Sequence, residues 1–191
     1  MQMFIHDIDS YLSIVQRISE GAEYADTYTS ADRKNIAKNL DHILFVRDRI
    51  GLDAKLYNQI SDLERPIVWN LIAEPICEES AMVLPYLMAM AESSDSIDLR
   101  ICLHPLERDA VKEIQQDSYP CFPWLIFEDG QGKMLGQWGP RSAEADQKLK
   151  ELRAKESDRQ RVMNTYREWF SEAGHEHLQA EFVHLFKQWQ T

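Results

Sequence analysis

Hydrophobic residues near the N-terminus recur at the three- and four-residue spacing of amphipathic helices. This spacing predicts three helices, over about residues 10–21, 30–51 and 53–63. Each would bury an apolar side and leave a polar side in water. The Arg65-Pro66 pair then ends the helical pattern. We therefore expect residues 1–64 to form a set of N-terminal helices.

After Pro66 the pattern changes to short apolar runs that alternate with helical segments. The runs predict strands at residues 67–73, 97–103, 124–127 and 133–138, with helices over about 77–93 and 105–117. A strand–helix–strand unit requires a right-handed parallel crossover. The glycine-containing turn before the last strand makes the final pair antiparallel. This order predicts an α/β fold, with a central mixed four-stranded sheet flanked by helices.

From Ser142 onward the pattern is helical again, and we expect a break at Ala173-Gly174. Aromatic residues of this segment recur at helical spacing, which favours docking against a core; a partner-binding face is the alternative. The whole chain is expected to form a single domain over residues 1–191. Its parts would be the N-terminal helices (1–64), a core (65–141) and the C-terminal helices (142–191).

The composition excludes some function classes. The net charge of −11 argues against nucleic-acid binding, because phosphates are bound by a basic face. No run of about 18 apolar residues is present to span a membrane. The first ten residues contain Asp7 and Asp9 and lack the pattern of a signal peptide. A cytoplasmic protein is the expectation.

The three cysteines, Cys77, Cys102 and Cys121, include no closely spaced pair. They predict neither a disulfide framework nor a zinc site. Cys102 falls in a predicted core strand and is expected to be a small apolar filler. The spacing of the C-terminal histidines does not place them on one helix face, so surface positions are expected rather than metal binding; these are His175, His177 and His184. We expect no metal and no cofactor.

Cys77 stands where the first strand passes into a helix. The unpaired N–H groups and the dipole at a helix N-terminus favour the thiolate, which is the nucleophilic form of cysteine. Ser80 follows one helical turn later, so its hydroxyl could reach the sulfur in a C-x-x-S arrangement. Pro85 lies inside the helix, and Pro123 opens the third strand, where a cis peptide bond is expected.

These residues resemble those of thioredoxins. The closer resemblance is to helix-extended bacterial thioredoxin-like proteins whose active-site stretch reads E-D-W-C-G-D, where this chain has E-P-I-C-E-E. Pro85 matches the helix-kinking proline, and Pro123 matches the cis-proline. Residues 138–141 match a W-G-P-R segment. The resemblance implies a thioredoxin fold with Cys77 as nucleophile, and a substrate groove formed by Ile76, Phe122 and Pro123.

The chain also departs from that pattern. Ile76 replaces the usual tryptophan, and Glu78-Glu79 replace Gly-Asp, which places negative charge beside the sulfur and opposes the thiolate. No second cysteine follows within the turn. Cys121 would either resolve a disulfide with Cys77 or simply pack at the strand entry. Glu74, Glu78 and Glu79 would either form a base or metal cluster or only stabilise the helix dipole.

The leading hypothesis is a monothiol thiol–disulfide oxidoreductase that acts through Cys77, with Ser80 stabilising the thiolate. The alternative is a redox-inactive thioredoxin-fold binding or adaptor module, and a third class is a structural scaffold or oligomer subunit. The expected partner is a protein or a low-molecular-weight thiol or disulfide. The oligomeric state is left open. Arg141 would hold a carboxylate or cap the helix that follows it.

Overall fold

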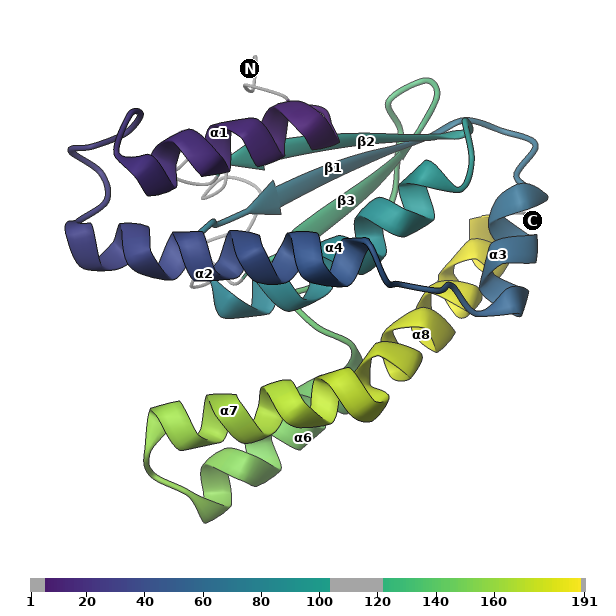
Figure 1. Ribbon diagram of the computed structural model, residues 1–191. Coiled ribbons are helices and arrows are strands. Elements are labelled where there is room, and N and C mark those ends of the chain that lie inside the picture. The colour runs from purple at the N-terminus through teal and green to yellow at the C-terminus, as the bar shows by residue number, and fades with distance from the viewer. Residues whose placement is uncertain (1–5, 104–121, 190–191) are drawn as a thin grey trace.

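A four-stranded sheet runs through the middle of the molecule in the computed structural model (Figure 1), which describes residues 6–103 and 122–189. Its strands are β1 (Ile67–Ala73), β2 (Ile97–Leu103), β3 (Trp124–Asp129) and β4 (Met134–Trp138). They lie in the order β2-β1-β3-β4. The β1–β2 pair is parallel, and the two other pairs are antiparallel. The mixed sheet predicted from the sequence is thereby confirmed.

The register of the strands assembles most of the core on one face of the sheet. Leu71 of β1 lies opposite Ile101 of β2 and Leu125 of β3. All three side chains are fully buried. Because side chains alternate along a strand, the same face also carries Trp69 and Phe127. A smaller cluster of Ile72, Cys102 and Phe122 forms separately from this main core.

Seven α-helices surround the sheet in the described residues. They are α1 (Ile8–Glu20), α2 (Ser30–Arg47), α3 (Ala54–Ser61), α4 (Glu78–Glu92), α6 (Ala143–Lys155), α7 (Arg159–Trp169) and α8 (His175–Trp189). Side-chain caps satisfy free N–H groups where several of them begin, including Asp7 for α1 and Thr29 for α2. The helix predicted over about residues 105–117 lies outside the described residues. In the part of the chain that the structure describes, no helix is both long and apolar enough to cross a membrane.

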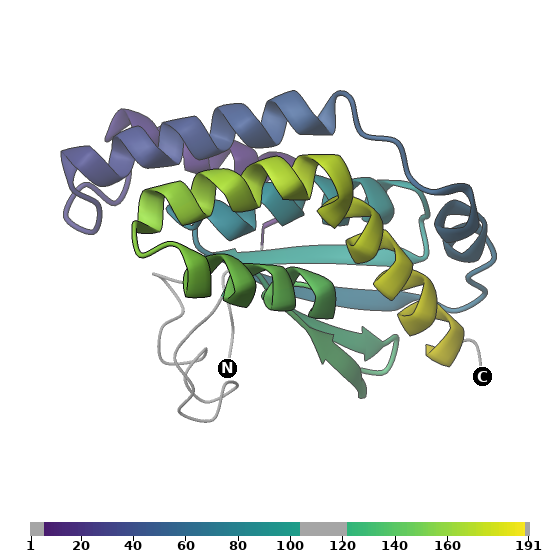
Figure 2. The same cartoon turned by 90° about the horizontal axis from the view of Figure 1, so that it is seen from below.

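Five aromatic rings form a dense group in the core, here called the aromatic seam. Helix α8 contributes Phe182, Phe186 and Trp189, and the strands β1 and β3 contribute Trp69 and Phe127. The Trp69 ring lies 5.5 Å from that of Phe182, and the Phe127 ring lies 4.3 Å from that of Trp189. Figure 2 shows α7 and α8 joined end to end as a bent helix that passes over the sheet. The aromatic spacing of the C-terminal segment therefore reflects docking against the core.

The break expected at Ala173-Gly174 corresponds to an interruption of the α-helix that contains no loop. Residues Phe170–Gly174 form a single π-helical turn that joins α7 to α8 without a loop. A Cβ atom on Gly174 would lie 2.7 Å from the Trp169 ring, so the glycine allows a close approach and does not end the helix. A second interruption lies earlier, between α6 and α7, where Glu156 is extended and Asp158 caps α7.

Candidate functional site

Cys77 occupies the N-cap position of α4, directly after the loop that leaves the carboxyl end of β1. Its carbonyl accepts a hydrogen bond from the N–H of Ala81 at 3.1 Å. The N-terminal helices hold this loop in place. The hydroxyl of Tyr28 donates to Glu74 at 2.8 Å, and the side-chain amide of Asn39 donates to the carbonyl of Pro75 at 2.9 Å.

The Cys77 sulfur is half-buried and faces the start of β3. Its thiol donates to the carbonyl oxygen of Phe122 over 3.5 Å. The next peptide bond, Phe122–Pro123, is cis. The sulfur also packs against the small cluster that contains Phe122. Cys77 therefore meets the Phe122-Pro123 pair, which begins 45 residues later in the sequence.

Burial is the largest influence on the Cys77 thiol and raises its pKa above the ordinary value. The N–H and hydroxyl groups of Ser80 favour the thiolate and act in the opposite direction, while the charge of Glu79 raises the pKa further. Ser80 itself is 2% exposed, and its hydroxyl makes no hydrogen bond within the described residues. The Cys77 thiol is therefore a weaker acid than an ordinary cysteine.

Arg141 closes one side of the site through a bidentate ion pair. Its guanidinium contacts both Glu79 oxygens, at 2.5 and 2.8 Å, and one Asp146 oxygen at 2.9 Å. Although burial acts against it, these partners hold the pKa of Arg141 above its ordinary value. The carboxylate that this arginine holds thus belongs to the helix turn that follows Cys77.

The turn that carries Arg141 also packs against Pro123. Gly139 has a φ angle of +125°, and a Cβ atom there would lie 2.2 Å from the Pro123 carbonyl oxygen. Only glycine permits both the backbone angle and this approach. The W-G-P-R segment therefore joins the two halves of the site, since Gly139 meets Pro123 and Arg141 meets Glu79.

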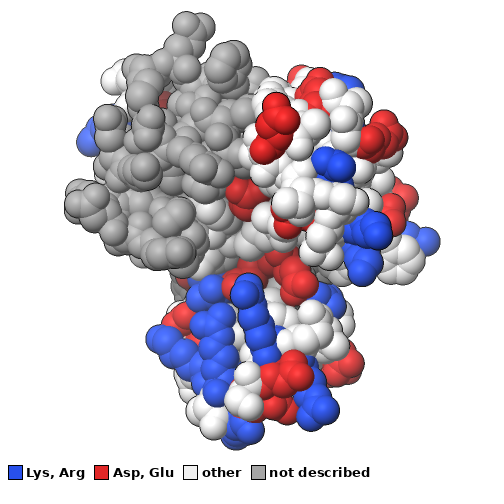
Figure 3. Space-filling model, turned by 90° about the vertical axis from the view of Figure 1, so that its left-hand side faces the viewer, with Lys and Arg blue, Asp and Glu red and all other residues white. Residues whose placement is uncertain are grey.

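A groove of about 930 Å³ opens beside Cys77, between α4 and the turn that joins α6 to α7. It is lined by Asn35, Ile76, Cys77, Glu78, Glu79, Arg153, Glu156, Ser157, Arg159, Gln160, Val162 and Met163. Figure 3 shows Lys and Arg side chains gathered on the lower lobe of the molecule, with acidic side chains along the boundary above it. One wall of the groove comes from the C-terminal helices, and the partly exposed Cys77 is among the residues that line it.

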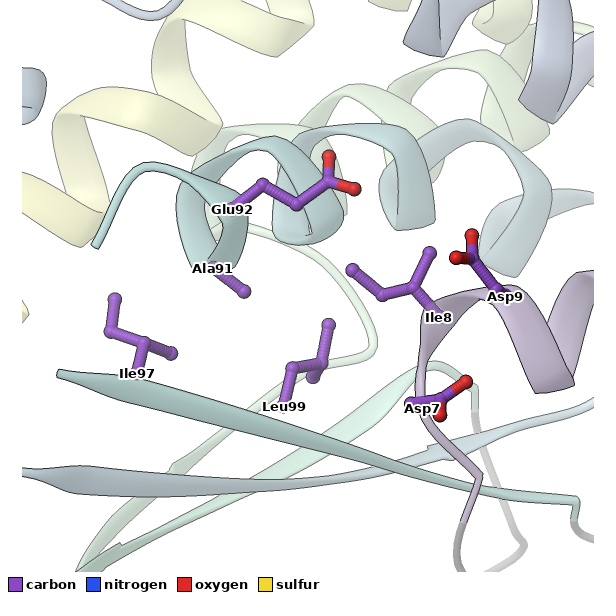
Figure 4. Close-up of a pocket in the computed structure, with 7 residues that line it drawn as sticks. All are labelled: Asp7, Ile8, Asp9, Ala91, Glu92, Ile97 and Leu99. Carbon is purple, nitrogen blue, oxygen red and sulfur yellow. The ribbon is translucent and has the colours of Figure 1, made fainter. Parts of the chain in front are cut away.

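A smaller hollow of about 270 Å³ lies between the start of α1, the end of α4 and β2. Figure 4 shows its apolar side chains, Ile8, Ala91, Ile97 and Leu99, with carboxylates around them. One of these carboxylates, Glu92, is paired with Arg47. The hollow contains no nucleophilic side chain, so Cys77 and its groove remain the candidate site.

The structure brings most of the predicted site residues together. Cys77 and Ile76 line the groove, Phe122 and Pro123 lie against the sulfur side, and Ser80 lies one turn into α4. Cys121 lies outside the described residues. Within the described ranges, no three His, Cys, Asp or Glu side chains are grouped to hold a metal ion. His175 instead stacks on Tyr86, and His177 stacks on Trp169.

Sequence reasoning missed the far wall of the groove. Arg153, Arg159 and Met163 come from α6 and α7, and nothing in their helical pattern indicates that they face a cysteine 76 or more residues away. Tyr28 and Asn39, which hold the Cys77 loop, were missed for the same reason. A cysteine followed by an acidic turn was the only local signal.

The strand order and the cysteine at the start of α4 are those of a thioredoxin-like α/β fold with helical extensions. A family model described as Thioredoxin matches residues 21–158. The chain therefore belongs to the thioredoxin family. No curated protein matches it.

Two solved structures share the fold. A protein of unknown function from Pseudomonas aeruginosa has 14% sequence identity and a TM-score of 0.57, over 87% of this chain and 90% of that one. An HIV epitope-scaffold also has 14% identity, with a TM-score of 0.62 over 96% of this chain and 93% of that one. At this identity the likeness concerns the fold alone.

Proposed function

We propose that this protein is a monothiol thiol–disulfide oxidoreductase that uses Cys77 as its nucleophile. The observation that carries the proposal is the half-buried sulfur at the N-terminus of α4, beside Pro123 and open to a groove of about 930 Å³. The thiolate attacks one sulfur of a disulfide. The old S–S bond breaks, the other sulfur leaves with the electron pair and takes up a proton, and Cys77 is left in a mixed disulfide.

The residues around the sulfur have distinct roles in this reaction. The N–H and hydroxyl groups of Ser80 stabilise the thiolate, while Ile76, Phe122 and Pro123 form the surface on which the substrate lies. A second thiol then resolves the mixed disulfide. It is supplied by a low-molecular-weight thiol, a partner protein or Cys121, and we assign it no metal or other cofactor.

The wider setting of the proposal follows from the sequence. Residues 1–191 would act as one domain, in which the helices of 1–64 and 142–191 frame the core of 65–141. Among thioredoxin-like proteins, the helix-extended bacterial group with an E-D-W-C-G-D stretch is the proposed relative. A working cysteine that must return to the thiol suits the reducing cytoplasm.

Reaction with a neutral disulfide tests the proposal. After incubation with bis(2-hydroxyethyl) disulfide, peptide mass mapping is expected to find the adduct on Cys77. Dithiothreitol-dependent reduction of insulin should be faster with the wild-type protein than with Cys77→Ser. Ser61→Ala is the control, because this exposed residue at the end of α3 lies outside the groove and its substitution should leave the rate unchanged. Equal rates for wild type and Cys77→Ser would overturn the proposal, and Cys121→Ser shows whether Cys121 resolves the adduct.

The second candidate function is a redox-inactive binding module. It is favoured by the raised pKa of Cys77 and by the ion pair that commits Glu79 to Arg141. For this function the groove would bind its partner without any bond to sulfur. Binding that survives in Cys77→Ser, together with no adduct on the wild-type protein, would support it over the oxidoreductase.

A further inference from the structure

The acidic and basic side chains that line the Cys77 groove differ in whether they form ion pairs. Each of its carboxylates has a cationic partner in the chain: Glu79 pairs with Arg141, Glu78 with Arg167 at 2.9 Å, and Glu156 with Arg161 at 3.6 Å. By contrast, Arg153 and Arg159 line the groove without an ion pair to any described residue. The acids are therefore neutralised within the protein, whereas these two cations line the groove with no acidic partner in residues 6–103 and 122–189.

These two arginines lie across the groove from the sulfur. Arg153 is near the end of α6 and Arg159 begins α7, so the short turn between the helices presents both guanidinium groups. Both side chains are exposed to solvent. A guanidinium group binds a carboxylate through two parallel hydrogen bonds, which gives direction as well as attraction.

The rest of the groove is suited to a small molecule. Ile76, Val162 and Met163 supply apolar surface between the sulfur and the arginines. A volume of about 930 Å³ lies within the usual range for small-ligand sites, roughly 300–1,000 Å³. At the sulfur end, the Ser80 hydroxyl is buried without a hydrogen-bond partner among the described residues. This hydroxyl favours the Cys77 thiolate, so it supports the sulfur and does not contact the ligand in the groove.

We propose that the groove selects disulfides of low-molecular-weight thiols that carry carboxylate groups. One sulfur of the disulfide lies at Cys77 while the carboxylate of the same molecule pairs with Arg153 and Arg159. This inference rests on the proposed thiol–disulfide exchange and adds the substrate class. Cys77 is oxidised to the mixed disulfide, and the half of the substrate that leaves is reduced to a thiol, with the proton lost by Cys77 balancing the proton it takes up.

Three disulfides of similar size and different charge test the inference. They are 3,3′-dithiodipropionate (anionic), bis(2-hydroxyethyl) disulfide (neutral) and cystamine (cationic). The rate of adduct formation on Cys77 is followed by mass spectrometry, and each rate is divided by that of N-acetylcysteine amide with the same reagent. The wild-type protein is expected to prefer the anionic over the neutral disulfide by roughly fivefold at low salt. The preference should shrink at high ionic strength, where exposed charges are screened.

Substitution of the two arginines gives the decisive comparison. Arg153→Gln/Arg159→Gln should remove the preference for the anionic disulfide while the neutral one reacts at an unchanged rate. Lys55→Gln/Lys133→Gln is the matched control, since it makes the same change in net charge at exposed positions outside the groove. A preference that is absent, or equally reduced in both double variants, would overturn the inference and leave the exchange reaction standing. Failure of all three disulfides to react at Cys77 would overturn the proposed function as well.

Discussion

The aromatic seam and the Cys77 site use buried side chains in opposite ways. In the seam, the Trp69 ring lies within 6 Å of three other rings, those of Phe127, Phe182 and Phe186. Its apolar groups fill volume, and one polar atom, the Trp69 indole nitrogen, is buried without a hydrogen-bond partner in the described residues. At the Cys77 site a thiol, a hydroxyl and an ion pair are partly or fully removed from water instead.

This contrast separates the residues that stabilise the fold from those that change the pKa of the Cys77 thiol. Dense packing of large rings lowers the free energy of the folded state, and its loss leaves a cavity. Burial of a thiol contributes less to stability but raises its pKa, and nearby donors and charges then modify that shift. Substitutions in the seam should therefore change stability most, and substitutions at the site should change reactivity most.

The largest expected effect is the loss of a ring from the seam. Phe182 is fully buried against Trp69, Phe127 and Trp138. Phe182→Ala should lower the free energy of unfolding by about 3–5 kcal/mol, measured by chemical denaturation. Phe45→Ala is the control, because that ring is 59% exposed and its loss should change stability by less than about 0.5 kcal/mol. A similar loss in both variants would mean that the seam does not dominate stability.

A second substitution tests whether the turn that packs against Pro123 at the site also stabilises the fold. Gly139→Ala forces a side chain onto a φ angle of +125° and places its Cβ against the Pro123 carbonyl. The backbone angle alone should destabilise the fold by roughly 1–3 kcal/mol. Movement of Pro123 should also expose the Cys77 thiol, so its alkylation should become faster.

Gly136→Ala is the matched control for this substitution. A Cβ atom on Gly136, in the neighbouring strand β4, would meet nothing within 4 Å. Its stability and its rate of Cys77 alkylation should therefore stay close to those of the wild type. If Gly139→Ala were as stable as Gly136→Ala, the turn would not be holding Pro123.

The seam and the sheet were largely predictable from the sequence. The apolar run of residues 67–73 and the aromatic spacing near the C-terminus both report burial directly, because burial follows the periodicity of a strand or helix. The π-helical turn at Phe170–Gly174 was not predictable in this way. A glycine there has the same local pattern whether it ends a helix or admits the Trp169 ring.

The site was predictable only for residues that are close to one another in the sequence or that match the thioredoxin pattern. The proximity of Cys77 and Ser80 follows from one turn of helix, and the resemblance to thioredoxins supplied Pro123. The partners of Glu79 and the wall formed by α6 and α7 depend on how distant elements pack. Neither hydrophobic spacing nor charge along the chain indicates which helix will face which loop. The sequence indicated that a negative charge opposes the Cys77 thiolate, but it did not indicate burial, which is the largest cause of the raised pKa.

The charge beside the sulfur provides a smaller and more specific test. Glu79→Gln removes an anion that disfavours the thiolate, so the pKa of Cys77 should fall towards its ordinary value. At a fixed pH below that pKa, more of the thiol is ionised. Iodoacetamide should then alkylate Cys77 roughly threefold faster. In wild type the rate should keep rising with pH beyond the range in which an exposed cysteine levels off.

Glu78→Gln serves as the control for that measurement. Glu78 is the preceding residue in the same helix turn, but its charge is paired with Arg167 and it is not among the main influences on the Cys77 pKa. Its substitution should leave the alkylation profile unchanged. The same shift in both variants would indicate a general effect of net charge and not a specific effect of Glu79.

The smallest expected effect separates stability from reactivity within one helix. Ser80→Ala removes a buried hydroxyl that makes no hydrogen bond among the described residues, so stability should barely change. The same hydroxyl favours the thiolate, so alkylation of Cys77 should slow by about twofold. At the other end of α4, the Ser93 hydroxyl donates to the carbonyl of Ala89 at 2.7 Å. Ser93→Ala should show the reverse, with stability lowered by about 1 kcal/mol and an unchanged rate. If Ser80→Ala lost as much stability as Ser93→Ala, Ser80 would belong with the residues that stabilise the fold. The proposed separation between residues that set stability and residues that set the reactivity of Cys77 would then be wrong.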